Sequence, residues 1–131
     1  MVQPASFSYF TDLTQEACFL WASDSIEDCL GYTPEEIVGL SAYSLVSKED
    51  VLLTHASHYE HVVNDFVASQ AMITLRHKDG GRVLIEAAFS TCHDFIACCA
   101  IVLEADAKNC KPTPVKCYHR HLWSSTSSIG S

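Results

Sequence analysis

The sequence lacks the features of membrane-spanning and fibrous proteins. Its longest run of apolar residues, Phe95 to Leu103, is far too short to cross a bilayer as a helix. No basic segment followed by an apolar one opens the chain, so we expect no secretion signal and an intracellular protein. Hydrophobic residues make up 48% of the chain and charged residues 18%, proportions that exclude wholesale disorder and coiled coil.

Basic side chains are also scarce. Sixteen acids face eight Lys and Arg, which gives a formal net charge of −8. Residues 1–69 hold eleven acids and one base, whereas residues 107–131 hold four bases and no acid. Because binding to a phosphate backbone needs clustered cations, we expect no direct nucleic-acid binding by the acidic part. The basic end could bind nucleic acid, bind an acidic partner, or bind nothing and remain a solvated tail. The solvated tail is the simplest of these three interpretations.

Common catalytic and metal-binding motifs are missing as well. The sequence has no phosphate-binding loop, nucleophile elbow or metalloprotease motif, which favours a protein that is not an enzyme. Seven cysteines are present without a C-x-x-C pair, so neither a thioredoxin motif nor a zinc knuckle is supported and no metal site is predicted. The odd number fits a reducing compartment, cytoplasmic or nuclear, where free thiols pack as small apolar side chains.

The pattern along the chain predicts an α+β domain. A β-rich hairpin comes first, then three short helices and one long helix, then three strands, the first two joined by a tight turn at Asp79-Gly80-Gly81. The order ββααααβββ predicts a five-stranded antiparallel sheet with the helices packed on one face. We expect residues 1–5 to be a flank, 6–104 to be the domain and 105–131 to be a polar, basic tail.

The long helix, expected over about residues 51–68, carries an amphipathic stripe. The apolar residues recur at spacings of four and three, which is the period of one helical face. We expect this stripe to pack toward the sheet. Its members are Leu52, Ala56, Tyr59, Val63 and Phe66.

Local strings of the sequence carry a family resemblance. They run from Trp21 to Tyr32, from Thr33 to Gly39, from Ser44 to Val51 and from Arg76 to Gly81. In this order they resemble the PAS family, with its S-x-x-I-x-x-x-L-G-Y-x-x-E-E-L-x-G opening, its L-x-H-P-E-D helix start and its R-x-K-D-G hairpin. The resemblance covers residues 6–104, and the stretch from Gly39 to Val46 is more similar to the PAS domains of eukaryotic transcription regulators than to those of bacterial kinases.

The resemblance implies a sensory and protein-interaction module of a signal-transduction or transcription regulator. Such a module acts by binding and dimerisation rather than catalysis, as a homodimer or as a heterodimer with another PAS domain. We expect the interface on the outer face of the sheet and at the N-terminal segment around Phe7 and Phe10, because the last strand is apolar on both faces and the helices cover only one of them. The expected interface residues are Phe7, Phe10, Phe95 and Ile101.

The resemblance also implies a ligand pocket between the sheet and the helices. Haem-binding members use a His on the long helix, which makes His55 the candidate ligand because it borders the apolar stripe, while His61 is expected on the wetter side. Flavin is also considered, although the region of the photoactive cysteine reads Glu49 to Leu53 and contains no Cys. No cofactor is assigned. The expected lining residues are Leu30, Tyr43, Leu45, Tyr59, Val63, Phe66, Ile73 and Phe89.

Two alternatives to an interaction module stay open. One is a haem-sensing or small-ligand-sensing domain of the same family. The other belongs to a different class, a small cone-shaped α+β enzyme with an Asp–His pair in its pocket. The opening β-hairpin counts against the enzyme, because such folds begin with long helices.

Overall fold

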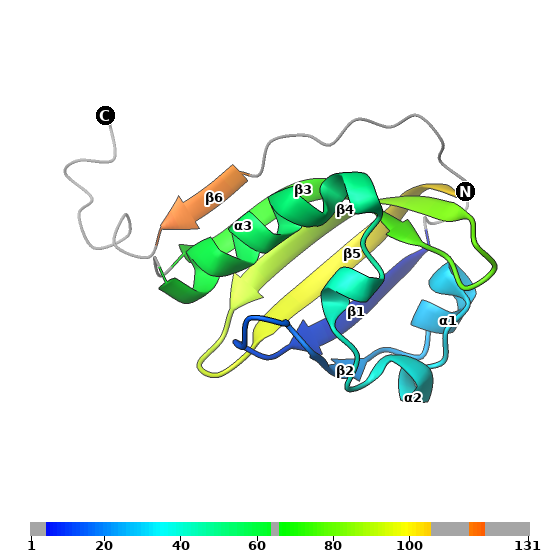
Figure 1. Cartoon of the computed structure of the whole chain (residues 1–131), viewed down its shortest axis with the longest axis horizontal. Coiled ribbons are helices and arrows are strands. Elements are labelled where there is room, and N and C mark those ends of the chain that lie inside the picture. The colour runs from blue at the N-terminus through cyan, green and yellow to red at the C-terminus, as the bar shows by residue number, and fades with distance from the viewer. Residues whose placement is uncertain (1–4, 64–65, 106–115, 120–131) are drawn as a thin grey trace.

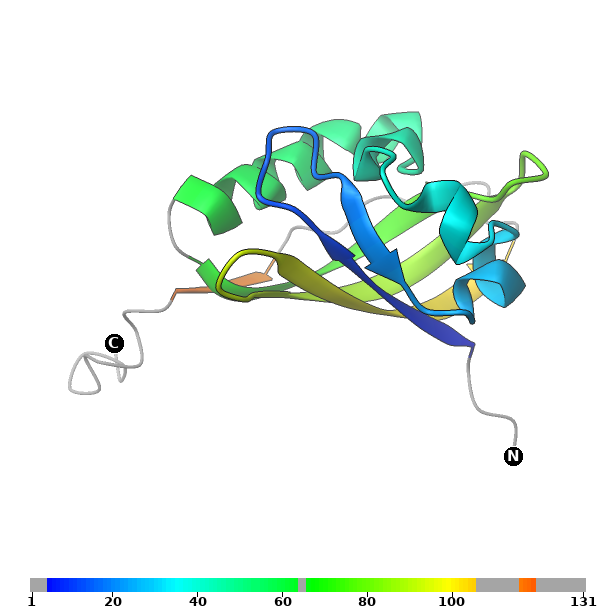
Figure 2. The same ribbon diagram turned by 90° about the horizontal axis from the view of Figure 1, so that it is seen from below.

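The computed structural model describes residues 5–63, 66–105 and 116–119 (Figure 1). Within these residues one antiparallel sheet of six strands has the order β2-β1-β5-β4-β3-β6. The helices lie over one face of this sheet and leave the other face open (Figure 2). The elements are β1 (Ser6–Thr11), β2 (Phe19–Ala22), α1 (Ile26–Leu30), α2 (Pro34–Ile37), η1 (Ala42–Ser44), η2 (Lys48–Asp50), α3 (Val51–Val63), β3 (Phe66–Arg76), β4 (Arg82–Thr91), β5 (Ile96–Ala105) and β6 (Lys116–His119).

The α+β architecture expected from the sequence is confirmed, with two additions to it. The five expected strands are present, and a sixth, β6, lies in the segment expected to be a tail and pairs with the first residues of β3. The long helix ends at Val63, so Phe66 belongs to β3 instead of to the helix. Pairing of Phe66 with His119 of β6, and of β3 with β4 from Ala68 onward, holds this part of the chain extended and overrides the helical period of its apolar residues.

Local capping motifs define where α1 ends and where α2 begins. Gly31 closes α1 with φ of 85°, a left-handed conformation that glycine adopts without steric cost. Thr33 begins α2 with a capping box: its hydroxyl accepts from the Glu36 amide, and the Glu36 carboxylate accepts from the Thr33 amide. These motifs therefore fix where the chain turns between β2 and η1.

A buried carboxylate attaches the start of α3 to the sheet. Asp50 is 2% exposed, and its Oδ2 accepts a hydrogen bond from the Thr74 amide of β3 at 2.6 Å. The neighbouring backbone adds two more bonds, from the Ser47 amide to the Thr74 carbonyl and from the Arg76 amide to the Leu45 carbonyl. Because Asp50 directly precedes α3, these bonds set which side of the helix faces the sheet.

Alternation along β1 sends its side chains to opposite faces of the sheet. Phe7 and Tyr9 point inward and are buried, whereas Ser8 and Phe10 point outward. The prediction of Phe7 as an interface residue is therefore wrong: it lies three residues from Phe10, and an odd spacing in a strand puts two side chains on opposite faces. Phe7 belongs to the core between the sheet and the helices.

Candidate functional site

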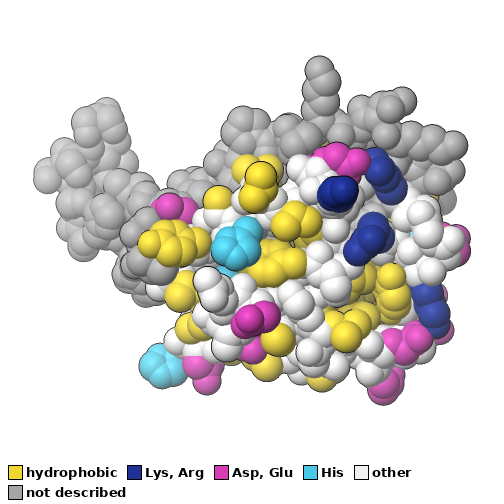
Figure 3. Space-filling view, in the orientation of Figure 1, with side chains coloured by type: hydrophobic (Ala, Val, Ile, Leu, Met, Phe, Trp, Pro, Cys, Tyr) yellow, Lys and Arg dark blue, Asp and Glu magenta, His cyan; other side chains and the backbone are white. Residues whose placement is uncertain are grey.

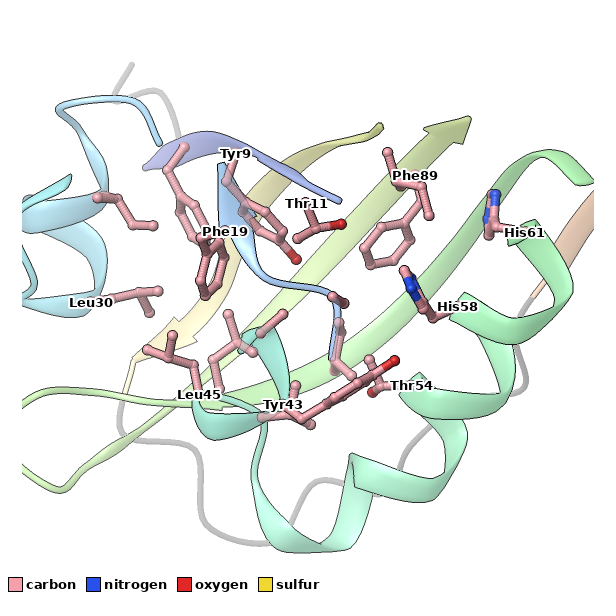
Figure 4. Close-up of a pocket in the computed structure, with 18 residues that line it drawn as sticks. Tyr9, Thr11, Phe19, Leu30, Tyr43, Leu45, Thr54, His58, His61 and Phe89 are labelled. Carbon is pink, nitrogen blue, oxygen red and sulfur yellow. The ribbon is translucent and has the colours of Figure 1, made fainter. Parts of the chain in front are cut away.

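A partly open cavity lies between the inner face of the sheet and the helices (Figure 4). It measures about 50 Å³. Aromatic and aliphatic side chains from β1, β2, α1, β3 and β4 form most of its wall, and α3 contributes a polar end with Thr54, His58 and His61. The volume exceeds the roughly 10–15 Å³ that one water needs and is well below the roughly 300–1,000 Å³ of a typical ligand pocket.

Five of the eight residues expected to line a pocket do line this cavity. Tyr59 does not, because it is 53% exposed on the outer side of α3. The side chains of Val63 and Phe66 lie outside the described part of the structure. The five lining residues are Leu30, Tyr43, Leu45, Ile73 and Phe89.

α3 faces the sheet with the side opposite to the one expected from its apolar stripe. Thr54, His58 and His61 face inward, while Leu52 is 85% exposed. Each inward polar side chain is satisfied: the Thr54 hydroxyl donates to the Asp50 carbonyl, His58 bonds the Thr14 carbonyl, and His61 bonds two hydroxyls. The three residues recur at spacings of four and three, as the apolar stripe does. The sequence therefore contains a second helical face of the same period, which a search for apolar residues alone does not detect.

The candidate haem ligand His55 lies outside the cavity. Its side chain is exposed, and its ring stacks on Tyr43 with 5.1 Å between the ring centroids. The two histidines that do line the cavity hold hydrogen bonds instead: His61 through both ring nitrogens and His58 through Nε2. With about 50 Å³ of space, the residues present do not fit a haem or a flavin.

One buried hydroxyl at the polar end has no partner. Among the described residues, Tyr43 Oη is shielded from solvent and makes no hydrogen bond. Its ring points toward Thr54 and His58 (Figure 4). Burial raises the pKa of Tyr43 to about 12, with a contribution from the nearby Glu16, so the hydroxyl keeps its proton. An unmade hydrogen bond of this kind costs about 1–3 kcal/mol, which an acceptor atom placed in the cavity would recover.

His58 separates the cavity from a groove on the surface. Its ring lines the cavity on one side and, on the other, a groove between α3 and the loop after β1. Asp12 organises that loop, because its Oδ1 accepts from the amide and hydroxyl of Thr14 and from the Cys18 amide. The loop in turn presents the Thr14 carbonyl to His58 Nε2 at 2.7 Å.

The His58 ring makes stability depend on pH. Burial lowers the pKa of His58, although the Thr14 carbonyl and Asp12 act in the opposite direction. The unfolded chain therefore binds the proton more readily than the folded one, and the free energy of unfolding falls as the pH drops through about 6.5. We expect His58→Gln, which keeps a donor for the Thr14 carbonyl and does not titrate, to flatten the dependence between pH 7.5 and 5.5. Urea unfolding curves at several pH values measure it, and parallel curves for the two proteins would contradict it.

The outer face of the sheet carries an aromatic cluster. The Phe10 ring lies 4.8 Å from the Trp21 ring and 4.6 Å from the Phe95 ring, measured between centroids. Trp21 remains 43% exposed, and Ile101 is exposed further along the same face. Three of the four predicted interface residues therefore share this face. Trp21 was not predicted, and its register opposite Phe10 is what brings it there.

Two kinds of feature are absent from the described part of the chain. No group of three or more His, Cys, Asp or Glu is placed to hold a metal ion there. In the same residues, no helix is long and apolar enough to cross a membrane.

Comparisons with known proteins agree on one fold. A family model described as the PAS fold matches residues 19–94. A solved PAS-B domain of Drosophila melanogaster Cycle with bound ethylene glycol is 23% identical, with a TM-score of 0.64 over 74% of this chain and 99% of that one. A variant of that domain with bound glycerol is 21% identical, with a TM-score of 0.65 over 74% and 99%. The PAS domain of the Cronobacter turicensis quorum-sensing receptor RpfR in complex with BDSF is 11% identical, with a TM-score of 0.67 over 79% and 99%. A search of curated proteins found no significant match.

Proposed function

The chain belongs to the PAS family, and from that premise we propose that it is a protein-interaction module of a signal-transduction or transcription regulator. It acts by binding and dimerisation rather than by catalysis. The aromatic cluster on the outer face of the sheet carries this proposal, since Phe10, Trp21 and Phe95 are held together in a half-exposed patch that the helices do not cover. Exposed aromatic anchors of this kind are enriched among the residues that dominate binding energy at interfaces.

The surroundings of the cluster suit a second sheet as the partner. Small side chains, Ser8, Ala88 and Cys99, line a groove on this face together with the polar Gln70 and Glu86. Small side chains on the face of a sheet allow another sheet to approach closely. The partner we propose is a second PAS domain, either another copy of this chain or a different one. The acidic body of the domain supports a protein partner over nucleic acid.

We expect substitution of the cluster to weaken this association. Trp21→Ala removes a large exposed ring, and losing an interface anchor worth about 2 kcal/mol or more raises the dissociation constant by roughly 30-fold or more. Sedimentation velocity over a concentration series measures self-association. Val38→Ala, at a similarly exposed apolar site beside α2, is the matched control. Equal dissociation constants for Trp21→Ala and the wild type would refute the cluster as the interface.

The cysteines support an intracellular site of action. Five cysteines, Cys18, Cys29, Cys92, Cys98 and Cys99, are unpaired, and Cys98 is buried beside Tyr9. Burial raises the pKa of Cys98 to about 12, so its thiol stays protonated and inert. Free thiols are the usual state of cysteine in the cytoplasm and nucleus.

A second candidate function, sensing of a small ligand, rests on the unpartnered Tyr43 hydroxyl. The cavity suits a small neutral molecule that brings one hydrogen-bond acceptor to this hydroxyl and little bulk. Because two similar domains are solved with ethylene glycol or glycerol bound, these two compounds are reasonable probes. We expect them to shift NMR signals of cavity residues and Tyr43→Phe to reduce the shifts. Shifts confined to the surface, or unchanged in Tyr43→Phe, would exclude this role of the cavity.

A further inference from the structure

The basic side chains of residues 5–105 gather in one region of the fold. These residues hold fifteen acids and four bases, which are Lys48, Arg76, Lys78 and Arg82. Lys48 begins η2, and the other three belong to the β3–β4 hairpin, where Arg76 ends β3 and Arg82 begins β4. Figure 3 shows Lys and Arg side chains, in dark blue, on the right half of the molecule. An otherwise acidic domain therefore has one basic region.

Two of these cations lie directly opposite each other. Arg76 and Arg82 are register partners in the pairing of β3 with β4, so their side chains leave the same face of the sheet. The Cβ atoms of such partners are about 4.5–5.5 Å apart, and like charges placed there destabilise a sheet. Local rules of sheet stability thus disfavour the pair, and exceptions of this kind are expected at functional positions.

The neighbours of the arginine pair neutralise only part of its charge. Arg82 Nη2 donates to Glu49 Oε1 at 3.0 Å. Arg76 Nη2 instead donates to the carbonyl of Ser44, a neutral acceptor, at 2.7 Å. Lys48, which is exposed, directly precedes Glu49 in η2. The exposed surface that these side chains form therefore combines three cations with one carboxylate.

Two neighbouring guanidinium groups suit carboxylate ligands. Each group is planar and has five N–H donors in a fork that matches the two oxygens of a carboxylate. In the described part of the structure, the hydrogen bonds of both arginines use Nη2 alone, so donors remain for a ligand. A nucleic acid fits less well, because a long polyanion would also meet the acids of the surrounding domain. A short acidic peptide needs only this region.

We propose that Lys48, Arg76 and Arg82 bind a short acidic segment of a partner protein, with a carboxylate between the two guanidinium groups. This surface is separate from the aromatic cluster on the outer face. Arg82 begins β4, whereas Thr91 ends it, beside the β4–β5 connection that contains Phe95 of the cluster. The 10 residues of β4 span roughly 30 Å, so the two contacts do not overlap.

Fluorescence anisotropy of a hexaglutamate peptide that carries a neutral dye tests this surface in the full chain. At low salt, where charge contacts are least screened, we expect Arg76→Gln to raise the dissociation constant by about fivefold or more. Adding Arg82→Gln is expected to raise it further, while circular dichroism shows an intact fold. A dissociation constant that stays at the wild-type value in both variants would overturn the proposal.

Two controls separate this surface from positive charge in general. Lys78→Gln removes a cation of the same hairpin whose Nζ already lies 2.6 Å from Glu36 Oε2, so we expect a change of less than about twofold. Lys108→Gln with Lys111→Gln removes two cations outside residues 5–105 and is expected to have an equally small effect. Equal losses in the controls would overturn the proposal. So would a single-stranded DNA of the same charge that binds as tightly and responds alike to Arg76→Gln.

Discussion

Asp50→Ala is expected to lower the free energy of unfolding by about 2–3 kcal/mol. The Asp50 carboxylate is buried and accepts from the Thr74 amide at 2.6 Å, across the joint between α3 and the sheet. Removing it leaves a buried amide without its acceptor and breaks a bond to a charged group, each of which carries a cost of this size. Urea unfolding at neutral pH measures the loss.

Two further variants test whether the loss of stability comes from the hydrogen bond between Asp50 and the Thr74 amide or from substitution in general. Asp50→Asn keeps an acceptor oxygen for the Thr74 amide, so we expect a smaller loss than with Asp50→Ala. Glu49→Ala removes an exposed carboxylate that pairs with Arg82 at 3.0 Å, and exposed pairs contribute about 0–1 kcal/mol. If Asp50→Ala and Glu49→Ala were equally mild, the carboxylate would not hold α3 to the sheet.

His61→Ala is the second substitution expected to have a large effect, a loss of about 2–4 kcal/mol. The ring is 3% exposed, and its two nitrogens bond Thr91 Oγ1 at 2.6 Å and Ser69 Oγ at 2.7 Å. Alanine leaves the buried Ser69 hydroxyl without this partner and enlarges the cavity, and the two costs add. Thermal or urea unfolding measures the loss.

The matched control is another histidine of the same helix. His55→Ala removes only an exposed ring that stacks on Tyr43, so we expect a loss within about 0.5 kcal/mol. A loss as large as that of His61→Ala would mean that the two histidines contribute alike and that the orientation of α3 described above is incorrect.

The fold followed from the sequence because its signals are local. Thr33 with Glu36, Gly31 and the Asp79-Gly80 turn each need only their own neighbours, and the turn forms as predicted. The three strings that carry these signals also carry the family resemblance. Local chemistry of this kind specifies where elements start and stop, and the order of the elements then limits the topology.

The orientation of α3 could not be predicted from apolar periodicity. Thr54, His58 and His61 face inward because the Asp50 carbonyl, the Thr14 carbonyl and two strand hydroxyls satisfy them. Those partners come largely from parts of the chain distant in sequence. A helix with one apolar stripe and one polar stripe of equal period leaves the choice of face to tertiary contacts. The prediction of His55 and Tyr59 at the pocket is wrong because it assumes that the apolar stripe of α3 faces the sheet.

The edges of the sheet limit where another strand could add to it. The outer edge of the 11-residue β3 pairs with β6 along its first part, and the Leu45–Ser47 segment bonds Thr74 and Arg76 along its second. At the opposite end of the sheet, the Phe19 backbone of the short β2 exchanges bonds with Gly39 and Leu40. Exposed strand edges invite pairing with other chains, and along these stretches of β3 and β2 the domain's own backbone already bonds the edge. Strand addition at these stretches is thus blocked, which favours the face-to-face association proposed above.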